Sequence, residues 1–305
     1  MVEPDQKDQQ LLLEKIYGIQ FPPDFFAFWR FATDNDALLR STNIELGLVG
    51  PFDILRDPAS GQNDDPVREA RYYNDPPEFL TIATGHTDGL HWGYYLDDPV
   101  KPPFPIVQYY SNDAFELSIV GATMFEVLRF QIELFHRDDT EYMAEEPEEY
   151  RDVYQTNLDR LARLREALQM YETGDRPEVG EEYVDKYSPT EYIRQVAAKT
   201  RDGMGIVVSA DKYRPLTGED MFQRWDFTPT TENIEPLAQE AMDLLEQGYP
   251  GAALKLGKDL WIFEDFRQLS YNLLDATYSA LNRPLLQKYL KLAISYREEC
   301  DSKNA

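Results

Sequence analysis

The first 140 residues combine two helical patterns with a run of extended ones. Apolar residues recur every three or four positions at 9–17 and at 21–34, "FPPDFFAFWRFATD", where prolines precede an aromatic stripe. Both patterns predict helices with one buried face. "GLVGPFDIL", in a loop-rich stretch, is expected to supply a short strand. The segments "EFLTIAT", "GLHWGYYLDD", "FPIVQYY" and "FELSI" predict an antiparallel meander, and "GATMFEVLRFQIELFHRD" predicts a helix after it.

Helical patterns dominate the rest of the chain. An amphipathic pattern predicts a long helix within 145–175, and the capping-box sequence Ser188-Pro189-Thr190-Glu191 predicts another to about Lys199. "GMGIVVSA" predicts a strand. Pro236 is expected to open a helix that Gly248 ends, and helical patterns also occupy 264–282 and 284–300.

The order of these elements predicts the fold class. Strands and helices do not alternate, so we expect an α+β fold with two lobes. The N-terminal lobe, 1–140, is expected to combine an antiparallel sheet with helices. The C-terminal lobe, 141–305, is expected to be mostly helical with a short sheet, and to carry the functional residues discussed below.

Composition narrows the classes of function. The 305 residues are 42% hydrophobic, which is typical of a folded protein, and carry a net charge of −26. This acidity disfavours direct binding of nucleic acid or of an anionic membrane, because both depend on Lys and Arg, and it favours a basic partner. A single cysteine and the lack of a membrane-length apolar run or signal peptide predict a soluble intracellular protein.

Residues 243–261, "DLLEQGYPGAALKLGKDLW", nearly match a phosphate-binding loop. That loop needs four residues between its glycines and a hydroxyl side chain after its lysine. Here five residues separate Gly251 from Gly257, and an aspartate follows Lys258. The intervening residues are mostly apolar, which predicts a packed segment and no phosphate binding.

The chain also lacks a sequence cluster typical of a metal or cofactor site. His86 and His91 lie in or beside an expected hairpin, with no cysteine or helical histidine pair nearby. Packing in a strand or turn is their expected role. Cys300 lies in a charged C-terminal segment, which does not favour a catalytic thiol. We therefore expect this chain alone to bind neither cofactor nor metal.

A polar stripe of Gln239, Asp243 and Glu246 lies opposite the leucines of the helix that ends at Gly248. Periodicity predicts a solvated face. The two acids lie in the last turn, where the helix dipole makes each exposed negative charge unfavourable by roughly 0.3–1 kcal/mol. A general base is the alternative interpretation of a carboxylate at this position.

Arg214 lies in the loop sequence "ADKYRPL", after the expected strand. An ion pair within the chain is the simplest interpretation of this side chain. Arginine on a loop can also bridge a carboxylate bidentately across an interface, so a docking role is the alternative.

Six segments resemble one known family when they are taken together. They are "FPPDFFAFWRF", "GLVGPFDIL", "YYNDPPEFLTI", "HWGYYLDDP", "GIVVSADKYRPL" and "LKLGKDLW", in the family's order. The set resembles the histone PARylation factors, accessory proteins of PARP-type ADP-ribosyltransferases. The resemblance implies a two-lobed α+β protein that docks on a transferase and completes its active site. NAD is then bound by the transferase and not by this chain.

The resemblance also implies roles for individual residues. The family's transferase-contacting arginine corresponds to Arg214, beside Tyr213, and its glutamate general base acts on an acceptor serine. Alignment on Tyr249 makes Glu246 this base, and we prefer this alignment. Asp243 is then expected in the docking surface.

A second alignment stays open. Without a gap from Gly251, Gln247 takes the position of the base and Glu246 that of a neighbouring aspartate. Glutamine cannot accept the proton, so the protein would then dock without supplying a base. In the preferred alignment, Gln247 is expected to contact the partner.

The expected partners are a PARP-type transferase and a serine-containing acceptor protein, with no direct contact to nucleic acid or membrane. The expected location is the cytoplasm for a bacterial protein and the nucleus for a eukaryotic one. A non-catalytic binding or immunity-type module that sequesters or inhibits a partner enzyme is the alternative function. A free-standing enzyme is least favoured, because no cofactor loop, metal cluster or nucleophile constellation was found.

Overall fold

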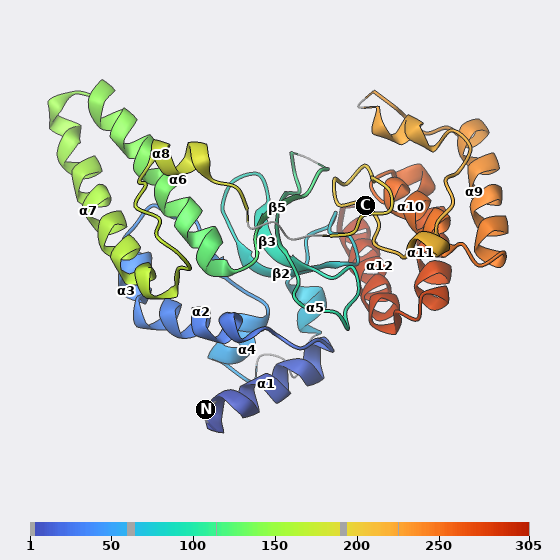
Figure 1. The fold of residues 1–305 in the computed structure, drawn as a ribbon, viewed down its shortest axis with the longest axis horizontal. Coiled ribbons are helices and arrows are strands. Elements are labelled where there is room, and N and C mark those ends of the chain that lie inside the picture. The colour runs from blue at the N-terminus through green and yellow to red at the C-terminus, as the bar shows by residue number, and fades with distance from the viewer. Residues whose placement is uncertain (1–3, 60–64, 114, 190–193, 225, 305) are drawn as a thin grey trace. The chain divides into compact units, whose positions relative to one another are not determined.

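Two compact units make up the protein, each assembled from separate stretches of chain (Figure 1). The first contains Met1–Gln20, Gly47–Ser118 and Ile193–Ala305, and the second contains Phe21–Leu46 and Ile119–Tyr192. The computed structural model describes residues 4–59, 65–113, 115–189, 194–224 and 226–304. The predicted α+β class is confirmed, because one antiparallel sheet accompanies a larger helical part.

The sheet carries the predicted meander. Its strands, in the order β1-β2-β3-β4-β5, are β1 (Gly47–Leu48), β2 (Phe79–Thr84), β3 (Leu90–Tyr95), β4 (Ile106–Tyr110) and β5 (Ser118–Gly121). The pairs from β1 to β4 are antiparallel, and every residue of β3 is buried. "GLVGPFDIL" contributes only two strand residues, because Pro51 begins a helix.

The helices of the first unit come from all three of its chain segments. They are α1 (Pro4–Tyr17), α4 (Pro51–Arg56), α5 (Pro66–Glu69), α9 (Thr231–Glu246), α10 (Pro250–Leu260), α11 (Arg267–Ala280) and α12 (Pro284–Asn304), with 3₁₀ turns at Ala210–Lys212, Glu219–Gln223 and Glu264–Phe266. α10 packs against α9 and α11, and α11 packs against α12 (Figure 1, orange to red).

The second unit is a helical assembly with an aromatic core. Its helices are α2 (Pro23–Asp34), α3 (Asp36–Leu39), α6 (Met124–Glu145), α7 (Arg151–Leu168) and α8 (Glu181–Lys186), with 3₁₀ turns at Glu148–Tyr150 and Gln169–Tyr171. α6 and α7 pack together, and Phe125 stacks on Tyr171 with ring centroids 4.4 Å apart. The lobe boundary expected at residue 140 falls within α6, and the division of the chain there stays a prediction.

The helix predicted from Ser188 to Lys199 is wrong over the part that the structure describes. Residues 190–193 lie outside the described residues, and 194–199 are not helical. The Arg194 guanidinium bonds instead to the Asp97 carboxylate, and the backbone near Ala198 pairs with Ile206. These long-range bonds favour extended backbone. The strand predicted over "GMGIVVSA" is likewise reduced to this isolated bridge.

The helix expected to begin at Pro236 begins earlier. α9 starts at Thr231, after an N-cap at Thr230 whose N–H donates to Asn233 Oδ1 at 2.9 Å. This cap fixes the first turn, since it satisfies a backbone donor that the helix leaves free. Pro236 lies inside the helix and is exposed. The predicted end at Gly248 is confirmed.

Candidate functional site

Two backbone hydrogen bonds cap the C-terminal end of α9. Gly248 N–H donates to the Leu245 carbonyl at 3.0 Å, and Tyr249 N–H donates to the Leu244 carbonyl at 2.8 Å. Gly248 has a φ of +91°, the left-handed conformation that this type of helix cap requires. The cap makes Glu246 the last helical residue, one position before a sharply defined turn.

The predicted polar stripe of α9 is confirmed. Gln239, Asp243 and Glu246 are exposed, while Leu237 and Ala241 are buried on the opposite side. Asp243 accepts a hydrogen bond from Gln239 Nε2 at 2.8 Å. Among the described residues, the Glu246 carboxylate has no hydrogen-bond or ion-pair partner. It is therefore available to a group from outside the chain.

Arg214 lies against the turn that follows Glu246. Its guanidinium carbon is 3.8 Å from the centroid of the Tyr249 ring, and Nη2 donates to the Tyr249 hydroxyl. Arg214 is exposed. Among the described residues Arg214 forms no ion pair, which was the simplest interpretation of the sequence, and it contacts a tyrosine instead.

Hydrogen bonds to Glu219 and to Glu240 of α9 hold the loop that carries Arg214. The Tyr213 hydroxyl donates to Glu219 Oε1, and Leu216 N–H donates to Glu219 Oε2 at 2.8 Å. Burial raises the pKa of Tyr213, and the bond to the Glu219 carboxylate raises it further. From the α9 side, Glu240 accepts bonds from both the backbone and the hydroxyl of Thr217, each 3.0 Å long.

Close backbone approach joins the same loop to α10. A Cβ at Gly251 would lie 2.9 Å from the Lys212 carbonyl oxygen and 3.0 Å from Tyr213 Cβ. Only glycine leaves room for this contact. The first turn of α10 therefore determines where the loop backbone of residues 212 and 213 lies.

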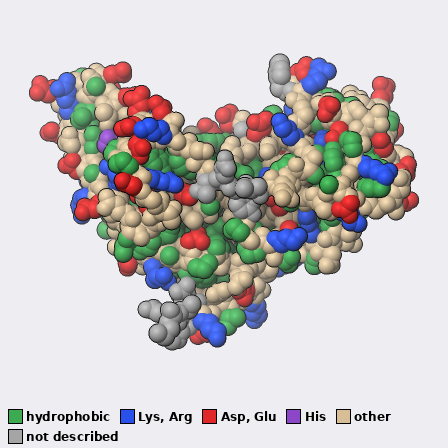
Figure 2. Space-filling view, in the orientation of Figure 1, with side chains coloured by type: hydrophobic (Ala, Val, Ile, Leu, Met, Phe, Trp, Pro, Cys, Tyr) green, Lys and Arg blue, Asp and Glu red, His purple; other side chains and the backbone are tan. Residues whose placement is uncertain are grey.

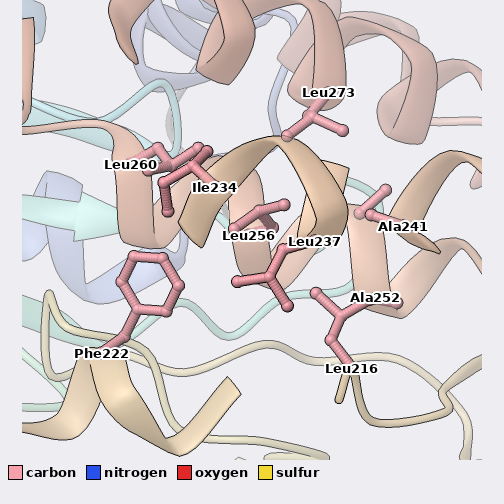
Figure 3. Close-up of a cluster of buried hydrophobic side chains, with 10 residues drawn as sticks. Leu216, Phe222, Ile234, Leu237, Ala241, Ala252, Leu256, Leu260 and Leu273 are labelled. Atoms are coloured by element: carbon pink, nitrogen blue, oxygen red, sulfur yellow. The ribbon is translucent and has the colours of Figure 1, made fainter. Parts of the chain in front are cut away.

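A buried apolar cluster supports these elements from beneath (Figure 3). Leu216 and Phe222 from the loop region contact a core made by α9, α10 and α11. Its members from the helices are Ile234, Leu237, Ala241, Ala252, Ala253, Leu256, Leu260 and Leu273. One continuous core therefore holds both the end of α9 and the Arg214 loop, which makes their mutual placement a property of the fold.

α10 occupies the sequence that nearly matches a phosphate-binding loop, and it is a buried helix. Lys258 Nζ donates to the Tyr95 hydroxyl at 2.5 Å and to the Gly205 carbonyl at 2.6 Å. Asp259 pairs with Lys255 at 2.7 Å and accepts a bond from Arg201 N–H. Burial raises the pKa of Asp259 to about 6, although the Lys255 charge acts in the opposite direction. These groups hold the core together.

The packing role expected of His86 and His91 is confirmed for His91 only, because His86 is exposed. His91 is fully buried, stacked on Tyr72 with centroids 4.0 Å apart, and its Nε2 lies 2.8 Å from Asp75 Oδ1. Within the described part of the chain, no group of three or more His, Cys, Asp or Glu residues could hold a metal ion. The described helices also include none long and apolar enough to cross a membrane.

Acidic side chains are not confined to the candidate site. Figure 2 shows them, in red, scattered over the visible face of both units, with basic side chains among them. Surface charge alone therefore does not mark Glu246. Its position does, because Glu246 lies at a capped helix end, Arg214 contacts Tyr249 of the turn that follows, and Glu246 has no partner within the described residues.

The structure groups the predicted site residues in one region. Asp243, Glu246 and Gln247 share the last turn of α9 and its cap, and Arg214 reaches the same turn through Tyr249. Tyr213 faces Glu219. Sequence reasoning missed the contact between Arg214 and Tyr249, which are 35 positions apart. It had used Tyr249 only as an alignment anchor, and no local pattern signals such a pair.

Fold and site together define an α+β protein with an exposed acidic helix end, followed by a turn whose tyrosine contacts an exposed arginine. The sequence model of the family described as histone PARylation factor 1 matches residues 8–297. This chain therefore belongs to the histone PARylation factor 1 family, as the six segments suggested.

Individual relatives support the same membership. The chain is 28% identical over 320 residues to the histone PARylation factor 1 of Mus musculus, covering 94% of this chain and 86% of that protein. It is 28% identical over 317 residues to the one of Danio rerio, covering 94% and 85%. A Homo sapiens protein called putative histone PARylation factor 1-like is 26% identical over 323 residues, covering 94% and 86%.

Proposed function

We propose that this protein is an accessory factor that docks on a PARP-type ADP-ribosyltransferase and directs ADP-ribosylation to serine by supplying Glu246 as general base. The names of the relatives, which refer to histone PARylation, support the accessory role. The single observation that supports Glu246 is its exposed carboxylate at the capped end of α9, beside the Arg214 loop.

The proposed chemistry needs only a carboxylate from this chain. A serine hydroxyl is a poor nucleophile near neutral pH. As its oxygen attacks C1′ of the ADP-ribose unit of NAD and nicotinamide leaves, Glu246 accepts the hydroxyl proton. A well-positioned general base of this kind typically accelerates a reaction by about 10²–10⁴-fold. The transferase binds NAD, and this chain supplies the base and part of the acceptor surface.

Docking is the proposed role of the residues around the base. Arg214 presents guanidinium donors that match a carboxylate of the transferase bidentately. Tyr213, Asp243 and Gln247 border the same surface from the loop and from the helix end. Because Arg214 contacts Tyr249, which follows closely after Glu246, docking through the arginine brings the end of α9 and its carboxylate to the partner.

Replacing Glu246 tests this proposal. The cognate transferase, NAD and a serine-containing acceptor peptide are combined with wild type, Glu246→Gln or Gln247→Ala at saturating accessory protein. We expect Glu246→Gln to lower the initial rate of serine modification by about 10²–10⁴-fold. Its affinity for the transferase should stay close to wild type, since the amide has the shape of the carboxylate. Gln247→Ala serves as the matched control and should keep most of the rate.

The gap-free alignment makes a different prediction for the same assay. If Gln247 occupies the position of the base, Glu246→Gln leaves the rate unchanged and Gln247→Glu raises it. That result would remove Glu246 from the mechanism and leave the docking role intact. A protein that binds the transferase and lowers all modification, with no change of acceptor residue, would instead be the sequestering module considered above.

A further inference from the structure

The Arg214 side chain is held by one residue through two kinds of contact. Its guanidinium carbon lies 3.8 Å from the Tyr249 ring centroid, and Nη2 donates to the hydroxyl of the same ring. Stacking covers one face of the guanidinium and the hydroxyl uses one of its five N–H donors. The remaining donors stay available along the exposed edge.

Tyr249 is itself a fixed platform. Its N–H closes the cap of α9 by donating to the Leu244 carbonyl at 2.8 Å, and Pro250 directly after it begins α10. The residue is half-buried. Its backbone is therefore fixed on both sides, and the contacts of its half-buried ring with Arg214 start from a fixed Cα.

Free arginine side chains sample many rotamers, and this freedom is lost when they bind a partner. A side chain that is already held in one orientation binds more tightly, because less order has to be imposed. We propose that Tyr249 is a positioning residue that pre-orders Arg214, so that its free edge presents paired donors to a carboxylate of the partner. This inference rests on the proposed docking function for its partner, but the ordering itself is a property of the isolated chain.

The ordering of Arg214 can be measured without a partner. We expect the Arg214 Nε–Hε order parameter, from ¹⁵N relaxation of the free protein, to be high in wild type. In Tyr249→Leu it should fall toward the values below about 0.6 that flexible groups show. Tyr249→Phe keeps the ring face and loses only the hydroxyl, so it should be intermediate. Equal order in wild type and Tyr249→Leu would overturn the proposal.

A double-mutant cycle separates positioning from direct contact. The dissociation constant for the transferase is measured for wild type, Tyr249→Leu, Arg214→Ala and the double variant, with urea midpoints as a check on folding. We expect Tyr249→Leu to weaken binding by about three- to ten-fold in the wild-type background. In the Arg214→Ala background the same substitution should have no effect, because a positioning residue acts only through its arginine.

The outcomes distinguish this inference from the docking proposal. An equal loss in both backgrounds would mean that Tyr249 contacts the transferase itself, and would overturn the positioning role. Unchanged binding in Arg214→Ala would reject the docking function of the arginine. The relaxation measurement would still decide, on the free chain, whether Tyr249 orders Arg214.

Discussion

The last turn of α9 and the helix α10 that follows it differ in the exposure and pairing of their charged side chains. Asp243 and Glu246 are exposed at a helix end whose dipole disfavours them, and neither has a basic partner among the described residues. Lys255, Lys258 and Asp259 are buried, and each is paired or hydrogen-bonded. The charges of the segment that nearly matches a phosphate-binding loop are therefore bonded within the core, while the two acids at the end of α9 are the accessible ones.

The two regions also differ in why each needs a glycine. Gly248 is needed for its backbone, since its φ is +91° and nothing lies within 4 Å of the place where a Cβ would be. Gly251 is needed for space, because a Cβ there would lie 2.9 Å from the Lys212 carbonyl oxygen. One glycine shapes the turn after Glu246, and the other lets the Arg214 loop approach α10.

The largest effect is expected from breaking the buried pair in α10. Lys255→Met leaves the Asp259 charge in the core without its cation, so the free energy of unfolding at pH 7 should fall by about 3–5 kcal/mol. Urea denaturation measures this loss. Lys255→Met/Asp259→Asn is the matched control: it removes both charges and keeps an acceptor for Arg201 N–H, so it should recover most of the stability.

The pH dependence of this loss follows from the direction of the Asp259 shift. Burial raises the folded-state pKa from the usual 3.8 to about 6, so the folded protein binds the proton more readily than the unfolded chain. The contribution of this group to stability is present below about pH 4 and is lost as the pH rises through about 6. Lys255→Met should therefore be less destabilising at pH 5 than at pH 7. An equal loss at both values would show that Asp259 does not take up the proton in this range.

An intermediate effect is expected where α10 contacts the Arg214 loop. Gly251→Ala forces the Lys212 carbonyl to move, which should cost about 1–3 kcal/mol, as overpacking usually does. Amide hydrogen exchange should report the displaced loop, because Lys212 N–H is bonded to the Ser209 carbonyl at 2.8 Å. Gly248→Ala is the control: it strains the backbone of the turn by about 1–2 kcal/mol, and its Cβ would meet no other atom within 4 Å. If exchange at Lys212 rises as much in this control, the loop is not held by α10.

Local sequence patterns were sufficient to predict the two faces and the end of α9. The period of α9 separates its apolar face from the stripe that contains Asp243 and Glu246, and Gly248 marks its end correctly. Pro236 was misleading, because proline is frequent in a first turn, whereas the cap at Thr230 begins this helix earlier. The start of a helix depends on which cap bonds are actually made.

Other parts depend on residues far apart in the sequence. Lys258 is buried and donates hydrogen bonds to Tyr95 and Gly205. Arg194 was expected in a helix, but it lies in non-helical backbone and bonds to Asp97. The contact of Arg214 with Tyr249 is of the same kind. A capping motif or a polar residue in a short window predicts local preference only, and tertiary bonds overrode that preference at Arg194.

The smallest expected effect is the change in stability on replacing Glu246, and its sign tells whether this carboxylate supports the fold or the proposed chemistry. Glu246→Gln removes a negative charge from the end of α9, so at low ionic strength it should raise the free energy of unfolding by roughly 0.3–1 kcal/mol, and salt should reduce the gain. Gln247→Glu, one position further, should lower stability by a similar amount. Thermal or urea unfolding in low and high salt measures both. A loss of stability in Glu246→Gln would mean that the carboxylate supports the fold. A gain accompanied by loss of serine modification would mean that this acid is retained at the helix end for its chemistry, against the local electrostatics.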